Sequence, residues 1–218
     1  GGVGLNSALT ATAGYTGTYY VEADSYGNNY SGDYQITIAT IEQPDIIFGT
    51  EGNDRIRGTR SDDIIHSEAG NDNIRARRGD DVIDAGEGND IVRAGRGADT
   101  IEGGLGRDRL YAGRDTDADV FIFNSHLDSS RGGSLRDKIF QFDSGEDVID
   151  LSGIDANTAT QENDLFGFSG YSAAANSVWL RDTGNHILVR ADVDGDRRYD
   201  FEVQLVRLSS MSEDDFIF

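Results

Sequence analysis

Aspartate recurs at every ninth position of a glycine-rich stretch that begins at residue 49. Seven consecutive nonapeptides, from GTEGNDRIR at 49–57 to GGLGRDRLY at 103–111, carry Asp in the sixth position and an aliphatic residue in the eighth. These aspartates are Asp54, Asp63, Asp72, Asp81, Asp90, Asp99 and Asp108. Carboxylates combined with backbone carbonyl oxygens suit Ca²⁺, because this cation takes about six to eight oxygen ligands in flexible geometry. The spacing therefore predicts a series of calcium sites.

The strands and turns that position these aspartates follow from the same register. Positions seven to nine form a short strand in which only the eighth side chain points inward, because side chains alternate along a strand. Positions one to six form the turn, where glycine provides positive φ and leaves carbonyl oxygens free. Two repeats make one coil, so every second aspartate shares an edge of a parallel β-roll. One edge then carries Asp54, Asp72, Asp90 and Asp108, and the other carries Asp63, Asp81 and Asp99.

Other residues extend the candidate ligand set. Beyond the seventh repeat, Asp117 keeps the spacing, and Asp119 precedes Phe121 after a one-residue slip. Backbone oxygens are expected from the turn glycines Gly79, Gly86, Gly88, Gly95, Gly97, Gly104 and Gly106. The first four repeats carry Thr, Glu or Arg at position two, so we expect weaker sites near Asp54 and Asp63 than near the aspartates from 81 to 108. The alternative for a single Asp is capping of its own turn, but seven in register favour calcium.

The nonapeptides resemble the repeats-in-toxin (RTX), or hemolysin-type, consensus GGxGxDxUx, a calcium-binding repeat. The resemblance implies a roll with an ion between stacked turns, roughly five to eight ions in all. The arginines at positions two, three, seven and nine are expected to form charge ladders with Asp and Glu on the outer faces.

The charge of the chain restricts its partners. With 40 acidic and 19 basic residues the net charge is −21, which opposes a compact state unless cations neutralise it. Nucleic acid is excluded as a partner because polyphosphate binding needs a basic field. The chain has no Cys, so metal is the expected staple, and it has no apolar run long enough to span a membrane.

The segment after the repeats carries a second resemblance. VFIF at 120–123, the pattern DxIxxFxxGxDxIDLSxIDAN from residue 137, ADVDGDRRYDFEVQL and a terminal DFIF occur in this order. They resemble the C-terminal domain of serralysin-type secreted metallopeptidases, which implies that an antiparallel β-sandwich-like region caps the roll. The expected divisions are residues 1–43, an N-terminal hairpin segment; 44–123, the roll; and 124–218, the cap.

The last four residues, Asp215 to Phe218, are an acidic residue followed by three apolar ones. In the serralysin-type family such an ending resembles the signal read by type I (ABC) exporters, and it makes residue 218 the expected natural end of the protein. An ordinary edge strand is the alternative.

Four carboxylates surround Gly195: Asp192, Asp194, Asp196 and Asp200. Their alternate spacing resembles the start of an EF-hand calcium loop, but the glycine falls at the fourth position and Val203 stands at the twelfth, where the EF-hand has Glu. A calcium site and a polar hairpin turn are both open interpretations.

The N-terminal residues predict two alternating strands, 18–22 and 34–40, joined by a Gly/Asn-rich turn into a hairpin. The segment resembles the last strands of a bacterial pre-peptidase C-terminal domain. Its tyrosines are expected to pack across the strands, with sugar binding as the alternative. The chain is therefore expected to be a fragment with an upstream catalytic domain.

No catalytic constellation is present in the sequence. HExxH and GxSxG are absent, and His66, His126 and His186 are scattered without ligand spacing. The expected function is that of a non-catalytic, calcium-binding module of a secreted, extracellular bacterial protein, with a protease as the parent, which folds on extracellular calcium. A calcium-stiffened carbohydrate-binding or adhesion module is the alternative.

Overall fold

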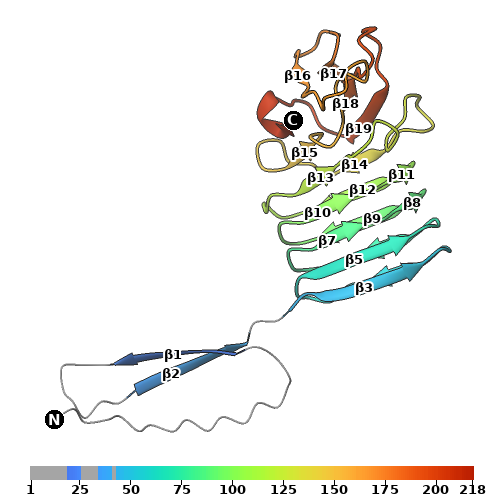
Figure 1. Ribbon diagram of the computed structural model, residues 1–218. Coiled ribbons are helices and arrows are strands. Elements are labelled where there is room, and N and C mark those ends of the chain that lie inside the picture. The colour runs from blue at the N-terminus through green and yellow to red at the C-terminus, as the bar shows by residue number, and fades with distance from the viewer. Residues whose placement is uncertain (1–18, 26–33, 41–42) are drawn as a thin grey trace. The chain divides into compact units, whose positions relative to one another are not determined.

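A computed structural model describes residues 19–25, 34–40 and 43–218 (Figure 1). The chain divides into two compact units, residues 1–43 and 44–218. In the first unit, β1 (Tyr19–Ser25) pairs antiparallel with β2 (Tyr34–Thr40). The connecting turn, the tyrosine side chains and the rest of the region likened to a pre-peptidase C-terminal domain lie outside the described part of the chain.

The second unit contains two sheets built from the nonapeptide strands (Figure 1). The seven-stranded sheet, in chain order, contains β3 (Asp45–Thr50), β5 (Asp63–Glu68), β7 (Val82–Asp84), β10 (Thr100–Glu102), β13 (Val120–Ile122), β15 (Val148–Asp150) and β20 (Phe216–Ile217). All of its pairings are parallel.

The nine-stranded sheet contains β4 (Arg55–Arg57), β6 (Asn73–Arg75), β9 (Ile91–Gly95), β12 (Arg109–Gly113), β14 (Lys138–Phe140), β16 (Gly167–Phe168), β17 (Ser177–Asp182), β18 (His186–Ala191) and β19 (Phe201–Val206). A third pair, β8 (Glu87–Gly88) and β11 (Leu105–Gly106), joins stacked turns. Successive strands of the two large sheets alternate along the repeats. The predicted all-β fold with a parallel roll is confirmed.

The aliphatic residue of each repeat forms the core between the sheets. One buried row contains Ile56, Ile74, Val92, Leu110, Ile139 and Leu205, which are direct neighbours across successive strands. The facing row contains Ile47, Ile65, Ile83, Ile101, Phe121, Ile149 and Phe216. Because apolar burial is the main favourable contribution to folding, each coil of about 18 residues adds only a few such side chains to this narrow core.

The cap continues the sheets of the roll. Parallel pairing extends past residue 123 through β14 and β15, and β19 pairs parallel with β14. The antiparallel strands are β17, β18 and β19, which extend the nine-stranded sheet at its C-terminal end. The short 3-10 helix η1 (Glu213–Asp215) leads into β20, the last strand of the other sheet. The roll and the cap therefore share one continuous core.

Glycine is required where the turns stack. Gly106 has a φ of 144°, and a side chain there would collide with the carbonyl oxygen of Gly88 in the preceding coil. The same close approach joins Gly88 to the carbonyl of Gly70. Each turn thus presents its carbonyl oxygens directly beneath the backbone of the next turn. Within the described residues, no helix has the length and apolar character needed to cross a membrane.

Candidate calcium sites

The aspartates of the repeats form two ladders along the edges of the roll. In each ladder, one carboxylate oxygen, Oδ1, accepts the backbone N–H of the aspartate one coil earlier, at N–O distances of 2.6–3.0 Å. One ladder contains Asp54, Asp72, Asp90, Asp108 and Asp137, and the other contains Asp63, Asp81, Asp99, Asp119 and Asp147. Repeated backbone hydrogen bonds therefore orient the carboxylates of all rungs after the first in the same way.

The second oxygen of most ladder aspartates is buried without a hydrogen-bond partner. This holds for Oδ2 of Asp72, Asp81, Asp90, Asp99, Asp108 and Asp137. A buried carboxylate oxygen without a donor is costly and is found where an ion belongs. Six such oxygens beside stacked carbonyl groups are a donor set that fits Ca²⁺.

The first rung of each ladder differs. Oδ2 of Asp54 accepts the N–H of Thr50 at 2.7 Å, and Oδ2 of Asp63 accepts the N–H of Thr59 at 2.7 Å. The threonine hydroxyls donate to the same two carboxylates. These carboxylates are satisfied within their own turns, which is the physical reason to place the weakest sites at the N-terminal end of the roll.

Burial raises the pKa of the ladder aspartates, and neighbouring carboxylates raise it further. The pKa of Asp81 is raised to about 7, that of Asp90 to about 6 and that of Asp99 to about 8. Burial likewise raises the pKa of Asp119 to about 7. Without a cation, these groups hold protons at a pH where free aspartate would be ionised.

The C-terminal rungs of both ladders depart from the nonapeptide count. Asp119 lies in its ladder, whereas Asp117 is exposed and stays outside it. Asp137 and Asp147, which the repeat count did not identify, continue the ladders 29 and 28 residues after the preceding rungs. Each stands two positions before a core isoleucine, as in the repeats, so the pattern Asp-x-Ile was the available signal.

The candidate glycines all lie in the stacked turns. Gly79, Gly86, Gly88, Gly95, Gly97, Gly104 and Gly106 have φ between 74° and 152°. The carbonyl oxygens of Gly79, Gly86 and Gly88 face the glycine backbone one coil later, at 97, 104 and 106. Backbone oxygens and carboxylates of neighbouring coils therefore converge at each edge. Calcium bound there would supply the positive charge that the buried carboxylates lack.

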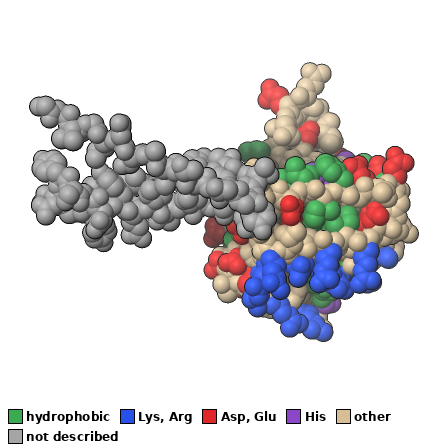
Figure 2. Space-filling model, turned by 90° about the horizontal axis from the view of Figure 1, so that it is seen from below, with side chains coloured by type: hydrophobic (Ala, Val, Ile, Leu, Met, Phe, Trp, Pro, Cys, Tyr) green, Lys and Arg blue, Asp and Glu red, His purple; other side chains and the backbone are tan. Residues whose placement is uncertain are grey.

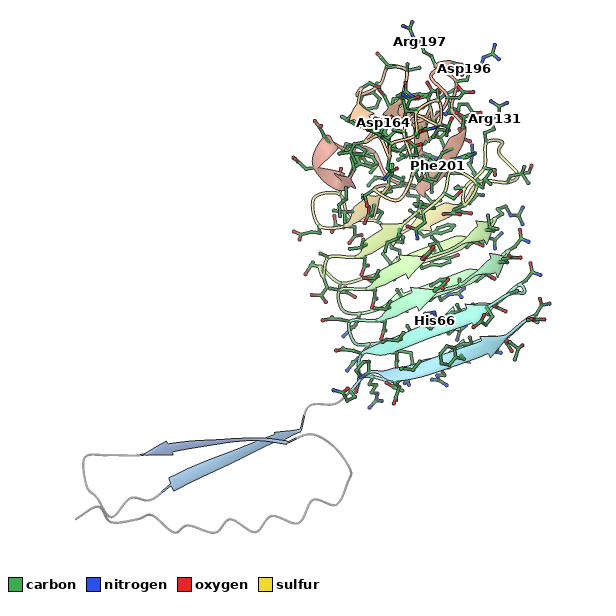
Figure 3. The ribbon with its side chains drawn as sticks, in the orientation of Figure 1. His66, Arg131, Asp164, Asp196, Arg197 and Phe201 are labelled. Atoms are coloured by element: carbon green, nitrogen blue, oxygen red, sulfur yellow. The ribbon has the colours of Figure 1, made fainter. Side chains whose placement is uncertain are left out.

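The cap holds a separate acidic cluster. One carboxylate oxygen from each of Asp192, Asp194 and Asp200 lies within 4.8 Å of the others. Both oxygens of Asp192 already accept backbone N–H groups, from Gly195 at 3.0 Å and from Arg197 at 2.9 Å among others. Asp196 is exposed on this loop, outside the group of three (Figure 3). This is the geometry of a polar turn, and a cation site here stays a prediction.

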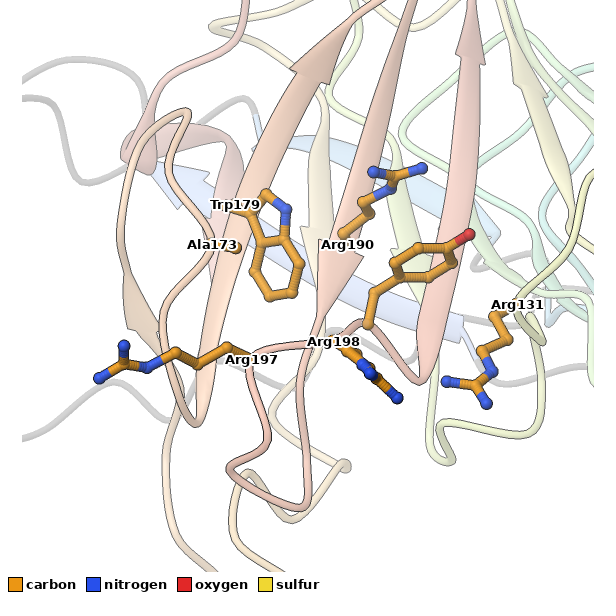
Figure 4. A pocket seen from close by; sticks show the side chains of 7 residues that line it. Arg131, Ala173, Trp179, Arg190, Arg197 and Arg198 are labelled. Carbon is orange, nitrogen blue, oxygen red and sulfur yellow. The ribbon is translucent and has the colours of Figure 1, made fainter.

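A hollow on the cap is lined by arginine and aromatic side chains (Figure 4). Its wall contains Arg190, whose guanidinium lies 4.1 Å from the centre of the Tyr199 ring and 2.7 Å from Oε2 of Glu202. Glu202 is buried and also accepts Arg136. The buried ion pairs hold this wall in place, since a buried carboxylate is tolerated only when it is paired.

The terminal segment is packed into the fold. Phe216 is buried and stacks on Phe218 with ring centres 5.5 Å apart. The buried carboxylate of Asp215 accepts the N–H of Gly145 at 2.7 Å and the hydroxyl of Ser144. Two of the four residues singled out as an export signal, Phe216 and Ile217, thus form the strand β20 that closes one sheet.

The prediction that the repeat arginines form charge ladders with acidic residues is wrong. No arginine of the described repeats has a carboxylate within ion-pair distance, and the ion pairs of the described residues are His66–Asp84 and three in the cap. The reason is that arginines recur one coil apart, so arginine stacks on arginine.

Comparison with protein families supports the calcium assignment. Residues 43–74, 66–101 and 84–118 match the family model described as RTX calcium-binding nonapeptide repeat (4 copies). The chain carries RTX calcium-binding repeats. These repeats imply several bound Ca²⁺ ions.

Three solved structures are similar to the chain. It is 26% identical to the AlgE6R3 subunit of the Azotobacter vinelandii mannuronan C5-epimerase, over 78% of this chain and 80% of that one, with a TM-score of 0.48. It is 23% identical to the AlgE6R2 subunit of the same enzyme, over 81% of this chain and 92% of that one, with a TM-score of 0.49. It is 15% identical to the extracellular lipase LipA of Serratia marcescens, over 83% of this chain and 40% of that one, with a TM-score of 0.32. No curated protein sequence matches significantly.

Proposed function

We propose that this chain is the non-catalytic, calcium-binding module of a secreted bacterial protein and that extracellular calcium drives its folding. The observation that carries the proposal is the set of six buried carboxylate oxygens without partners in the two ladders. In the calcium-free roll these groups oppose folding, because burial without a donor or a cation is unfavourable. Ions that bind only the folded roll stabilise it by mass action.

Calcium scarcity would keep the chain unfolded inside the cell. The narrow core offers little apolar burial per coil, and the net charge of −21 adds self-repulsion. An unfolded chain is the form that a type I (ABC) exporter can thread. Folding outside the cell would then oppose backward movement and help an upstream domain, in our proposal a secreted peptidase, to fold.

The terminal segment supports an export role that precedes folding. In the folded protein Phe216 is buried, and the backbone N–H of Leu151 donates to the carbonyl of Ile217 at 2.9 Å. An exporter that recognises Asp215 to Phe218 would therefore need the chain before this strand forms. Replacing the segment by a Gly/Ser sequence should abolish export from a bacterium carrying a type I exporter. Normal export of that variant would remove this part of the proposal.

Calcium-driven folding is tested by far-ultraviolet circular dichroism. Titration of the chelator-treated chain with calcium should give a cooperative rise in β signal that magnesium does not reproduce. A full β signal in chelator at neutral pH would refute the proposal.

Two variants test where the ions bind. Asp137→Asn keeps the oxygen that accepts the N–H of Asp108 but removes the charge. It should lower the number of calcium ions bound per chain. Asp117→Asn makes the same change at an exposed position outside the ladder and should leave that number unchanged. Equal effects of the two variants would contradict the ladder as the ion site.

A further inference from the structure

Seven arginines form two columns along one side of the roll, which we call the arginine ridge. The first column lies on the strands β4, β6 and β9, and the second lies in the turns that follow. The ridge consists of Arg57, Arg75 and Arg93, and of Arg60, Arg78, Arg96 and Arg114. Figure 2 shows basic side chains gathered in one band on the roll. Five of the seven, all but Arg96 and Arg114, belong to the first five repeats, and none of the seven has an acidic side chain paired to it among the described residues.

The ridge opposes the stability of the fold. Arg57 is in direct register with Arg75, and Arg75 with Arg93, on neighbouring parallel strands. Like charges placed directly opposite each other on adjacent strands are destabilising. None of the ridge side chains has a carboxylate within 4.0 Å among the described residues. Arg93 lies 4.9 Å from the centre of the Tyr111 ring, which fixes its direction without neutralising it.

The opposite edge of the roll carries the opposite charge. A hollow there is lined by Glu51, Glu68, Glu87 and Asp84, and Nδ1 of His66 lies 3.4 Å from Asp84. Acidic side chains thus gather at this edge and the arginines at the other, where the turns also carry the exposed carboxylates of Asp62 and Asp80. A sequence that breaks a local stability rule at many positions on one side, in a chain of net charge −21, indicates a surface kept for a partner.

The ridge has the shape of a linear binding site. Two adjoining hollows run along it and share Gly95 and Arg96. Strands of neighbouring coils lie about 4.8 Å apart, so each column offers one guanidinium at that interval. Guanidinium groups pair with carboxylates in a two-pronged geometry. We propose that the arginine ridge binds an unbranched polysaccharide that carries a carboxylate on each sugar ring.

Spacing and field favour this ligand over nucleic acid. Successive phosphates of a DNA strand lie about 3.4 Å apart along the axis, closer than the interval between coils. A polyphosphate is also a denser anion, and a chain of net charge −21 repels it more strongly. In a polysaccharide whose pyranose rings are linked through opposite sides of the ring, each sugar lengthens the polysaccharide by about the distance between two neighbouring strands of the roll.

The test measures binding of a short, fluorescently labelled oligogalacturonate by anisotropy, in saturating calcium. We expect binding that weakens with salt, and no binding of the fully methyl-esterified oligomer. Arg78→Ser with Arg96→Ser should lower the affinity about tenfold, because each exposed ion pair contributes up to about fivefold. Arg131→Ser with Arg181→Ser is the matched control, since it removes two exposed arginines from the cap, and it should bind like the parent chain.

Four results would overturn the proposal: no binding by the parent chain, equal loss in both double variants, tighter binding of single-stranded DNA through the same arginines, or self-association that the ridge variant abolishes. Analytical ultracentrifugation reports the last. The side chains of Arg78 and Arg96 are exposed and make no hydrogen bond in the ladders, and those of Arg131 and Arg181 are exposed as well. Both double variants should therefore fold at calcium concentrations no higher than the parent chain needs. A negative binding test would therefore not contradict calcium-driven folding. A negative calcium titration would contradict calcium-driven folding, and it is measured in a separate experiment.

Discussion

Replacing Asp99 by Asn should stabilise the calcium-free roll while weakening its response to calcium. Oδ1 of Asp99 accepts the N–H of Asp81 at 2.9 Å, and an asparagine oxygen can accept the same hydrogen bond. The other oxygen is buried without a partner. The substitution therefore removes a buried charge and keeps the ladder.

The size of the effect follows from the pKa of Asp99. Burial, together with the neighbouring carboxylates of Asp119 and Asp81, raises this pKa from the ordinary 3.8 to about 8. Keeping the group protonated at pH 7 costs about 4 kcal/mol, since each pKa unit corresponds to about 1.4 kcal/mol. Because the folded pKa is the higher one, the contribution of this group to stability is fully present below about pH 4. It is lost as the pH rises through about 8.

The assay is a pH titration in chelator with the β signal followed by circular dichroism, because the calcium-free parent chain should fold only where its ladder carboxylates are protonated. Asp99→Asn should keep the folded β signal to a higher pH than the parent chain, since the cost of Asp99 grows by several kcal/mol between about pH 5 and pH 8. In saturating calcium the parent chain should be the more stable of the two, because the variant lacks a charged calcium ligand. Asp80→Asn is the matched control: Asp80 is exposed in the same kind of turn and accepts the N–H of Ala98. A pH midpoint of folding equal to that of the parent chain, or the same shift of the midpoint for Asp80→Asn, would refute the reasoning.

Three further predictions concern protons, turns and the last strand. At an acidic pH where circular dichroism shows the calcium-free chain to be folded, calcium binding should release protons, seen as acidification of a weakly buffered solution, because ladder carboxylates with raised pKa must ionise to bind the ion; absence of proton release from the folded chain would contradict the raised values. Gly106→Ala should abolish calcium-dependent folding, because the new side chain collides with the preceding coil. Gly145 has a φ of 96° and open space around it, so Gly145→Ala should lower the unfolding free energy in urea by only about 1–2 kcal/mol. Similar losses in the two variants would show that the turns do not stack tightly. Phe216→Ala should lower the unfolding free energy by about 3–5 kcal/mol, since the side chain of Phe216 is buried. The side chain of Ile217 is 42% exposed, so Ile217→Ala should lower the unfolding free energy far less. Equal losses would mean that β20 does not close the core.

Much of the roll could be predicted from the sequence because its determinants are local and periodic. The aliphatic eighth position, the turn glycines and the sixth-position aspartates repeat with one spacing, so a count of residues gives the strands, the inward face and the edges. The same count failed once the repeats ended. Loops between Asp108 and Asp137 and between Asp119 and Asp147 change the spacing without changing the stacking.

The sequence by itself determined that the chain is an acidic, cysteine-free array of nonapeptides whose register suits calcium, since composition and period are properties of the chain alone. The tertiary structure alone decided which carboxylates share a ladder, because Asp137 and Asp147 reach their rungs only through the path of the chain between coils. It also decided which aspartates keep a free oxygen, since Thr50 satisfies Asp54 while the rungs above it find no donor. The stacking of arginine on arginine has the same origin, because contacts between coils depend on register in space and not on neighbours along the chain.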